Sequence, residues 1–269
     1  MKKISLIIPV LIALVIVIPG CEKKKGCTDP TALNFDAEVD EEDGSCLYES
    51  DNFQLKFHHM AGALPFDYNQ EFTLTNGRKI KFTRAQMYLS GFIASGASFE
   101  NEYDRHLLIT GEGNGSYPIG PLISANPVTG IRLAIGVDSA YNHMDPASFA
   151  ASDPLSANQE HFGHWGWNPG YKFIIMEGMM DSTTSMNGTV SYPFIYHLGF
   201  EEIYKPFTIQ TDFTSDGTDE LIELNIDWLV FFNDLDLPNE NSSHMTSADQ
   251  KLVGHKIIDS AVNAITLKQ

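Results

Sequence analysis

From residue 51 onward, short segments in which apolar and polar side chains alternate are separated by turn residues, and this pattern restricts the fold more than any other feature. Residues 53–57 alternate strictly, as a strand with one buried face does. Asn76 and Gly77 stand between two such segments and predict a hairpin, because both residues tolerate a positive φ. The predicted strands cover residues 53–57, 70–75, 79–84, 87–94, 106–110, 131–137, 172–178, 192–198 and 206–212. So many short strands with turns between them predict an all-β fold, an antiparallel β-sandwich.

The end of the chain has a different periodicity. Residues 221–232 form a longer apolar run that fits either a strand or a helix. After this run, Thr246 or Ser247 can cap a helix, and apolar residues return at near-helical spacing, namely Leu252, Ile257, Ile258, Ala261 and Ile265. We therefore expect a C-terminal helix beside the sandwich.

Acidic residues far outnumber basic ones, with 35 Asp and Glu against 17 Lys and Arg and a formal net charge of −18. A surface this acidic repels phosphate backbones, so we expect no nucleic-acid partner. Cations are the ligands that such a surface attracts.

The first twenty residues have the features of a signal peptide: two lysines precede an apolar run, residues 4–18, that is too short to span a bilayer as a helix. The sequence Ile-Pro-Gly before Cys21 resembles a lipobox, which implies cleavage before Cys21 and lipidation of its thiol. Residues 21–25 would then form a tether, with lipid alone attaching the protein to the cell envelope. We expect the outer membrane, facing the periplasm or the cell surface. A plain secretory signal with an incidental cysteine is the alternative.

Two cysteines remain once Cys21 is assigned to lipid. Cys27 and Cys46 are expected to pair in an oxidising compartment, and closing their loop contributes about 3 kcal/mol in the chain-entropy model. Residues 26–48, from Gly-Cys-Thr-Asp-Pro to Asp-Gly-Ser-Cys-Leu-Tyr, resemble a small disulfide module that is common in secreted bacterial proteins. Its crowded carboxylates suit Ca²⁺, and the candidate ligands are Asp36, Asp40 and Asp43. A solvated acidic spacer is the alternative.

Histidine and methionine are gathered at a few places in the chain. His143, His161 and His164 lie near one another with Met144 beside them, and further histidines stand at the ends of predicted strands. Imidazole and thioether together suit copper better than calcium or magnesium. A histidine at a strand end is often a surface or hydrogen-bonding residue, so a structural role remains open. The sequence contains no nucleotide-binding loop, nucleophile elbow or zinc-protease helix, and we expect no enzymatic activity.

Several further motifs occur in a fixed order along the chain. The main ones are Asn142-His143, His164-Trp165-Gly166-Trp167 and Tyr196-His197-Leu198-Gly199. Together with the strands around them, these motifs resemble the MbnP-like copper-binding domain, and the likeness covers residues 52–268. The resemblance implies a β-rich domain that binds copper outside the cytoplasm.

The resemblance also implies a site. The histidines of its motifs are the first candidate copper ligands, namely His143, His164 and His197, and His58 on the first strand is a further one. His161 stands where the sequence departs from the family and is either an added ligand or a loop residue, while the chemistry of the thioether adds Met144 as a candidate. Such a set favours Cu(I), while Cu(II) stays open. The best-studied branch of the family is paired with an MbnH-type di-haem enzyme related to MauG and the cytochrome peroxidases, which oxidises a tryptophan to kynurenine near the metal. Trp165 and Trp167 are the candidates for that modification.

The sequence therefore supports a copper-binding lipoprotein that captures or handles copper, and it leaves maturation by a di-haem partner as a second hypothesis. A third hypothesis belongs to another class. It is a cell-surface β-sandwich that binds protein or carbohydrate and has no functional metal site.

Overall fold

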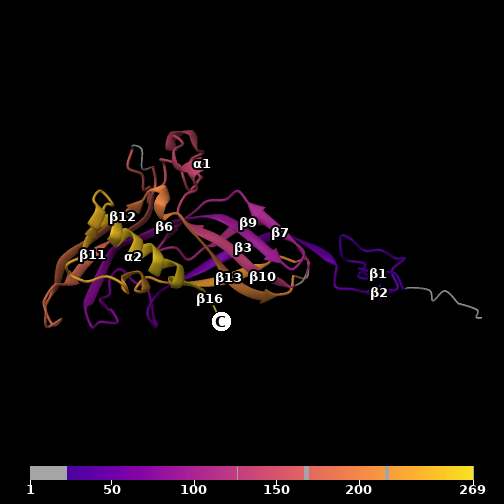
Figure 1. The fold of residues 1–269 in the computed structure, drawn as a ribbon, viewed down its shortest axis with the longest axis horizontal. Coiled ribbons are helices and arrows are strands. Elements are labelled where there is room, and N and C mark those ends of the chain that lie inside the picture. The colour runs from indigo at the N-terminus through magenta and orange to yellow at the C-terminus, as the bar shows by residue number, and fades with distance from the viewer. Residues whose placement is uncertain (1–22, 126, 167–169, 216–217, 269) are drawn as a thin grey trace, which may run out of the picture.

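Two β-sheets that pack face to face form the body of the protein (Figure 1). The structure is a computed structural model that describes residues 23–125, 127–166, 170–215 and 218–268. The large sheet has the order β13 (Lys205–Phe213), β10 (Val128–Ile135), β6 (Lys79–Gly96), β11 (Lys172–Asp181), β12 (Val190–Gly199) and β15 (Ser242–Ser243), with β5 (Phe72–Thr73), β7 (Glu100–Tyr103) and β8 (Leu107–Thr110) also pairing with β6. The small sheet has the order β16 (Ile265–Leu267), β14 (Leu221–Asp227), β3 (Leu47–Ala61) and β4 (Leu64–Pro65), with β9 (Ser116–Ala125) pairing with β3.

Helices occupy the connections and the C-terminal region. They are α1 (Ser139–Asn142), α2 (Ala248–Ala264) and the short 3₁₀ helices η1 (Pro146–Ser148), η2 (Glu201–Ile203) and η3 (Val230–Phe232). In the described ranges, no helix has the length and apolarity that a membrane crossing requires. The segment around α1 projects from one side of the sandwich (Figure 1).

The predicted β-sandwich is confirmed, and so is the C-terminal helix. Phe72 pairs with Ile80 across the turn at Gly77, whose φ is 91°, as the predicted hairpin requires. Residues 221–232, which fitted strand or helix, form β14 and then η3. The α2 helix begins after Ser247, whose hydroxyl accepts a hydrogen bond from the backbone N–H of Gln250 at 3.3 Å.

The pairing differs from the expected antiparallel arrangement at two places. β14 runs parallel to β3, with Leu224 beside Phe57, and β15 runs parallel to β12. Antiparallel order is imposed only on strands that a short hairpin joins. These pairs are distant in sequence, so the packing of the two sheets determines their direction.

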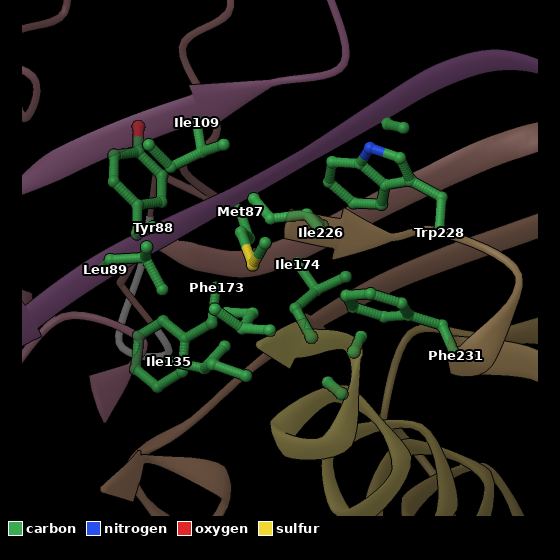
Figure 2. Packing of buried hydrophobic residues seen from close by; sticks show 14 of the residues in the cluster. Met87, Tyr88, Leu89, Ile109, Ile135, Phe173, Ile174, Ile226, Trp228 and Phe231 are labelled. Carbon is green, nitrogen blue, oxygen red and sulfur yellow. The ribbon is translucent and has the colours of Figure 1, made fainter. Parts of the chain in front are cut away.

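Aromatic and branched side chains from both sheets fill the space between them (Figure 2). Met87 of β6 and Ile174 of β11 lie in one core with Ile226 of β14, Trp228 and Phe231, and each of these side chains is fully buried. Burying one such side chain contributes about 1.5–3 kcal/mol. This core fixes the large sheet, on whose end the candidate site is built.

Trp228 also contacts a largely buried histidine. Its indole Nε1 donates a hydrogen bond to Nδ1 of His59 at 3.1 Å, and the two rings are stacked. Burial lowers the pKa of His59 to about 4, because removal from water disfavours the charged imidazolium. His59 therefore stays neutral in the folded protein under mildly acidic conditions.

The lowered pKa of His59 predicts that the folded protein loses stability in mild acid. The ordinary histidine pKa is 6.5, so below that pH the unfolded chain binds more protons than the folded one, and stability falls as the pH drops towards 4. His59 should account for about 3 kcal/mol of this loss. Urea unfolding across this pH range should show a shallower slope in His59→Gln, whose amide oxygen can still accept the indole hydrogen bond. Equal slopes in the variant and the wild type would contradict the assignment.

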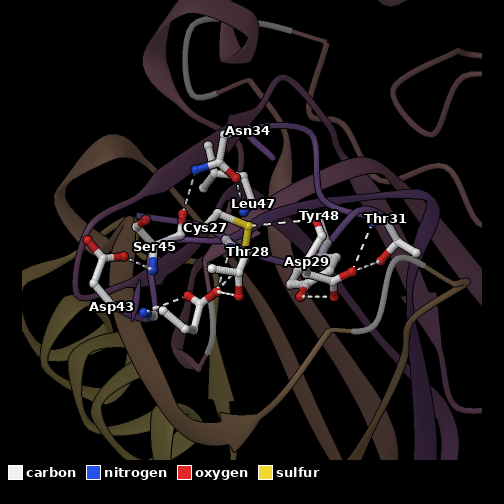
Figure 3. The surroundings of a disulfide bond; sticks show 12 residues. Cys27, Thr28, Asp29, Thr31, Asn34, Asp43, Ser45, Leu47 and Tyr48 are labelled. Carbon is white, nitrogen blue, oxygen red and sulfur yellow. Dashed lines mark hydrogen bonds between the residues drawn. A yellow bond between two sulfur atoms is a disulfide. The ribbon is translucent and has the colours of Figure 1, made fainter. Parts of the chain in front are cut away.

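The N-terminal module surrounds a disulfide between Cys27 and Cys46, which confirms the predicted pair (Figure 3). The side-chain amide of Asn34 donates to the carbonyl of Ser45 at 2.7 Å, and its oxygen accepts from the backbone N–H of Leu47 at 2.7 Å. β1 (Lys25–Gly26) and β2 (Glu41–Glu42) pair beside it. Turn hydrogen bonds and one disulfide therefore hold a segment that has only a very small apolar core of its own.

Candidate metal centre

A cleft of about 650 Å³ lies between the segment that carries α1 and η1 and the loop that leads into β11. Its walls include His143, Met144, His164 and Trp165. Two pairs of residues singled out in the sequence, about twenty positions apart, therefore share one concave surface. This cleft is the best candidate for a metal centre.

Asn142 joins the two walls of the cleft. Its side chain is fully buried, and its Oδ1 accepts a hydrogen bond from the backbone N–H of Tyr171 at 2.9 Å. Gly170 has a φ of 76°, and a Cβ there would lie 2.2 Å from the backbone oxygen of Asn142. The close approach of the two segments therefore requires glycine at this position.

His143 and Met144 follow α1 directly and are open to solvent. Nε2 of His143 lies 2.9 Å from Oε1 of Glu201, and the His143 side chain is 46% exposed. Met144 is 42% exposed, which is unusual for a thioether that could otherwise fill a gap in the core. Both donors can be reached from solvent.

His164 is held more tightly than His143. Its Nδ1 accepts a hydrogen bond from the backbone N–H of Gly166 at 2.8 Å, and its ring stacks on Phe162 and meets Tyr171 edge-on. Burial, and then the nearby Lys172, lower the pKa of His164. The imidazole is therefore neutral at neutral pH, and the lone pair on its Nδ1 is already engaged by the N–H of Gly166.

Trp165 lies against the end of β12. A Cβ on Gly199 would be 2.3 Å from Cζ3 of Trp165, so the benzene edge of the indole rests directly on this glycine. Phe200 packs beside it at 5.5 Å between ring centroids, and Nζ of Lys172 lies 5.9 Å from the indole centroid. The benzene half of the indole is therefore fixed. Trp167, the other candidate, lies outside the described residues.

His197 has other neighbours. Its Nε2 is 2.7 Å from Oε1 of Glu177, and its ring lies 4.8 Å from that of His244. Burial lowers its pKa, with the hydrogen bond to Glu177 acting in the opposite direction. His197 is not among the residues that line the cleft. The structure thus separates it from His143 and His164.

The remaining histidine candidates also lie apart from the cleft. His58 on the small sheet contacts Glu223 and Lys268 through Nε2. His161 uses its backbone carbonyl to accept a hydrogen bond from Gln86 at 2.7 Å, and its side chain does not line the cleft.

The candidate calcium ligands have separate partners. Asp36 pairs with Lys24 at 2.7 Å, which lowers the pKa of Asp36, while Asp40 accepts from the backbone N–H of Lys24 and Asp43 from that of Ser45. Among the described residues, Cys27, Glu42 and Cys46 are the one group of three His, Cys, Asp or Glu whose ligand atoms lie within 4.8 Å of one another. Because two of these are the disulfide cysteines, the group is not a preformed cation site. Calcium binding stays a prediction.

Three neighbours of the cleft were not identified as site residues from the sequence. Gly199 ends the motif Tyr196-His197-Leu198-Gly199, whose histidine is its conspicuous residue, and Lys172 lies five positions beyond Trp167. Glu201 carries no sequence signal, because a lone glutamate after a strand is ordinary.

The lipobox cysteine Cys21 and the preceding leader lie outside the described residues.

The fold and the cleft define a β-sandwich protein with an imidazole, thioether and indole site at one end of its large sheet. A family model described as MbnP matches residues 50–246, and the chain belongs to that family. Among solved structures, MbnP from Methylosinus trichosporium matches 69% of this chain and 77% of its own, at 14% identity and a TM-score of 0.45. No match was found among curated proteins.

Replacing Gly199 with alanine should displace Trp165, since the added methyl group would overlap the indole edge and approach the carbonyl oxygen of Tyr171, 2.4 Å from the new Cβ. We expect a cost of about 1–3 kcal/mol and a shifted indole N–H signal in the NMR spectrum of tryptophan-labelled protein. Trp165→Phe assigns that signal. Gly115→Ala is the matched control, because a Cβ there meets no atom within 4 Å. An unmoved Trp165 signal in Gly199→Ala would show that the glycine does not determine the indole position.

Proposed function

We propose that this protein is an extracytoplasmic copper-binding lipoprotein that captures or holds copper and has no catalytic activity of its own. One observation carries the proposal: His143, Met144 and His164 line a single solvent-open cleft with Trp165 as a neighbour. Membership of the MbnP family is consistent with it.

The donors in the cleft fit copper. Imidazole nitrogen and thioether sulfur form a borderline-to-soft set that favours Cu(I) and offers little to Ca²⁺ or Mg²⁺, which prefer oxygen. Asp145 also lines the cleft and adds negative charge, and the net charge of −18 attracts cations to the whole surface. The geometry favours His143 and Met144, with His164 beside them in the cleft, over His197, His58 and His161.

The expected location agrees with this function. A disulfide between Cys27 and Cys46 suits an oxidising compartment. With lipid on Cys21, the domain would be attached to the cell envelope at the outer membrane, where the copper that it meets comes from outside the cell. Ca²⁺ binding by the module between the tether and the sandwich stays a prediction, because its described carboxylates do not gather into a group of ligands.

Copper binding is tested with paired variants. The protein is loaded with Cu(I), desalted and analysed by elemental mass spectrometry, and its affinity is measured by competition with a chromogenic Cu(I) chelator. We expect about one copper per chain, and we expect His143→Ala and Met144→Leu to weaken binding by at least about 10-fold. His197→Ala is the matched control, because that imidazole lies outside the cleft. Equal losses in His143→Ala and His197→Ala would contradict the cleft as the site, and full-length protein from native cells that retains no copper would favour the metal-free interaction module.

We further propose that a di-haem enzyme of the MbnH and MauG type oxidises a tryptophan of this site to kynurenine. Trp165 fits this role because its benzene edge is fixed on Gly199. The pyrrole ring, which the conversion opens, is at the opposite end of the indole. The conversion breaks the bond between Cγ and Cδ1 of the pyrrole ring in a four-electron oxidation, and the haem partner accepts these electrons and passes them to a peroxide oxidant. Hydrolysis then releases Cδ1 as formate, so that the side chain loses one carbon and gains one oxygen.

The modification has a direct signature in the mass spectrum. A peptide that contains Trp165 and Trp167 should gain about 4 Da in protein from native cells, and fragmentation should place the gain on one residue. We expect Trp165→Phe to abolish the gain and Trp167→Phe to retain it. An unmodified peptide from native cells would contradict the proposal, and a gain that survives Trp165→Phe would move the modification to Trp167.

A further inference from the structure

Of the two histidines that line the cleft, His143 contacts a hydrogen-bond acceptor and His164 contacts a hydrogen-bond donor. Nε2 of His143 lies 2.9 Å from a carboxylate oxygen of Glu201, and a carboxylate can only accept a hydrogen bond. Nδ1 of His164 lies 2.8 Å from the backbone N–H of Gly166, which can only donate. In the neutral rings, Nε2 therefore carries the proton in both histidines. In His143 this Nε2–H is the group that contacts the partner, whereas in His164 the contact uses the lone pair on Nδ1.

The two rings therefore leave different nitrogens free to contact a metal ion. In His143 the nitrogen left for an incoming ion is Nδ1, which carries a lone pair. In His164 the nitrogen left over is Nε2, which carries a proton and can donate a hydrogen bond but cannot bind a cation without losing its contact with Gly166.

We propose that Glu201 is a positioning residue that holds His143 in the Nε2–H tautomer and so makes Nδ1 its copper-binding nitrogen, while His164 serves the site as an N–H donor. This inference rests on the proposed copper function. Carboxylates that hold the second nitrogen of a metal-binding histidine fix the ring and make it a stronger ligand. Glu201 would act on copper only through His143.

The position of Glu201 gives it a second connection to the site. It is the first residue of η2 and follows Phe200, which packs on Trp165 and has a φ of 83°. Gly199, one residue earlier, supports the benzene edge of Trp165. Three consecutive residues at the end of β12 therefore contact both the indole and the imidazole, and the strained backbone at Phe200 sets their relative direction.

The pair is exposed enough to be tested without unfolding the protein. The side chains of His143 and Glu201 are 46% and 51% exposed, so the contact between them adds little to stability. Glu202, the next residue, pairs with Lys251 at 2.9 Å on the same short helix. Glu202→Ala removes the same charge from the same turn and is the matched control, while Glu201→Gln keeps an acceptor oxygen without the charge.

The first measurement uses full-length, metal-free protein labelled with ¹⁵N-histidine. Long-range ¹H–¹⁵N correlation spectra identify the protonated nitrogen of each ring, with His143→Asn and His164→Asn assigning the signals. We expect Nε2–H at both histidines in the wild type. Glu201→Ala should shift His143 towards a mixture of tautomers, and Glu201→Gln and Glu202→Ala should keep the wild-type pattern.

The second measurement is Cu(I) affinity of the same proteins by chelator competition. We expect Glu201→Ala to weaken binding by about 10-fold or more, Glu201→Gln to restore much of the loss, and Glu202→Ala to stay within about twofold of the wild type. An unchanged His143 pattern in Glu201→Ala, or an equal loss of affinity in Glu202→Ala, would overturn the positioning role.

The two measurements separate the two proposals. A wild type that binds no copper, with the tautomers as expected, would overturn the copper function and leave Glu201 as the residue that orients His143. A wild type that binds copper with no dependence on Glu201 would overturn the positioning role and leave the copper function intact.

Discussion

The hydrogen bond from the backbone of Tyr171 to the buried side chain of Asn142 is the contact on which the site depends. It joins the segment that supplies His143 and Met144 to the loop that supplies His164 and Trp165. Leaving either buried group without a partner costs about 1–3 kcal/mol, so the two segments stay together even though both are irregular. A metal centre on loops is precise only if the loops are held in this way, and here one amide side chain does so from within the protein.

Strand geometry explains how His197 and Gly199, which belong to one motif, are placed relative to the cleft. Side chains two residues apart on a strand share a face and are about 6.6 Å apart along it, so His197 and Gly199 of β12 face the same side. Trp165 covers the glycine, and Lys172 stands beside its ring. Burial is the largest cause of the lowered pKa of both His164 and His197, and the charge of Lys172 also lowers each. His197 thus shares a face of β12 with the glycine on which Trp165 rests, but it does not line the cleft.

The sequence predicts the fold well wherever the information is local. Alternation gave β3 and β12, a turn dipeptide gave the β5–β6 hairpin, and a capping serine gave α2. β9 was not predicted because Pro118, Gly120 and Pro121 are typical of turns. In the structure they lie on an edge strand whose one pairing partner among the described residues is β3. The parallel pairing of β3 with β14 depends on contacts between distant segments, which no local pattern encodes.

In the candidate site, too, local features could be predicted from the sequence and long-range contacts could not. Asn142-His143 and His164-Trp165 line one cleft although about twenty positions separate the two motifs. Only the neighbours within each motif follow from the sequence, and the hydrogen bond between Asn142 and Tyr171 joins the two segments. The sequence gives no information about what a lone strand-end histidine touches, and His58 and His197 prove to contact glutamates.

The exposure of the donors bears on what kind of copper protein is proposed. A site that keeps its metal for structural reasons is closed, with every position filled by protein ligands. In the cleft, His143 and Met144 are 46% and 42% exposed, and the hydrogen bond between His143 and Glu201 is open to water. An ion held there can be reached by a second ligand and exchanged without unfolding the loop, which is what a protein that passes copper on requires. The other side of the cleft, with His164 packed on Tyr171 and Trp165 on Gly199, would then supply the fixed surface beside which such an exchange takes place.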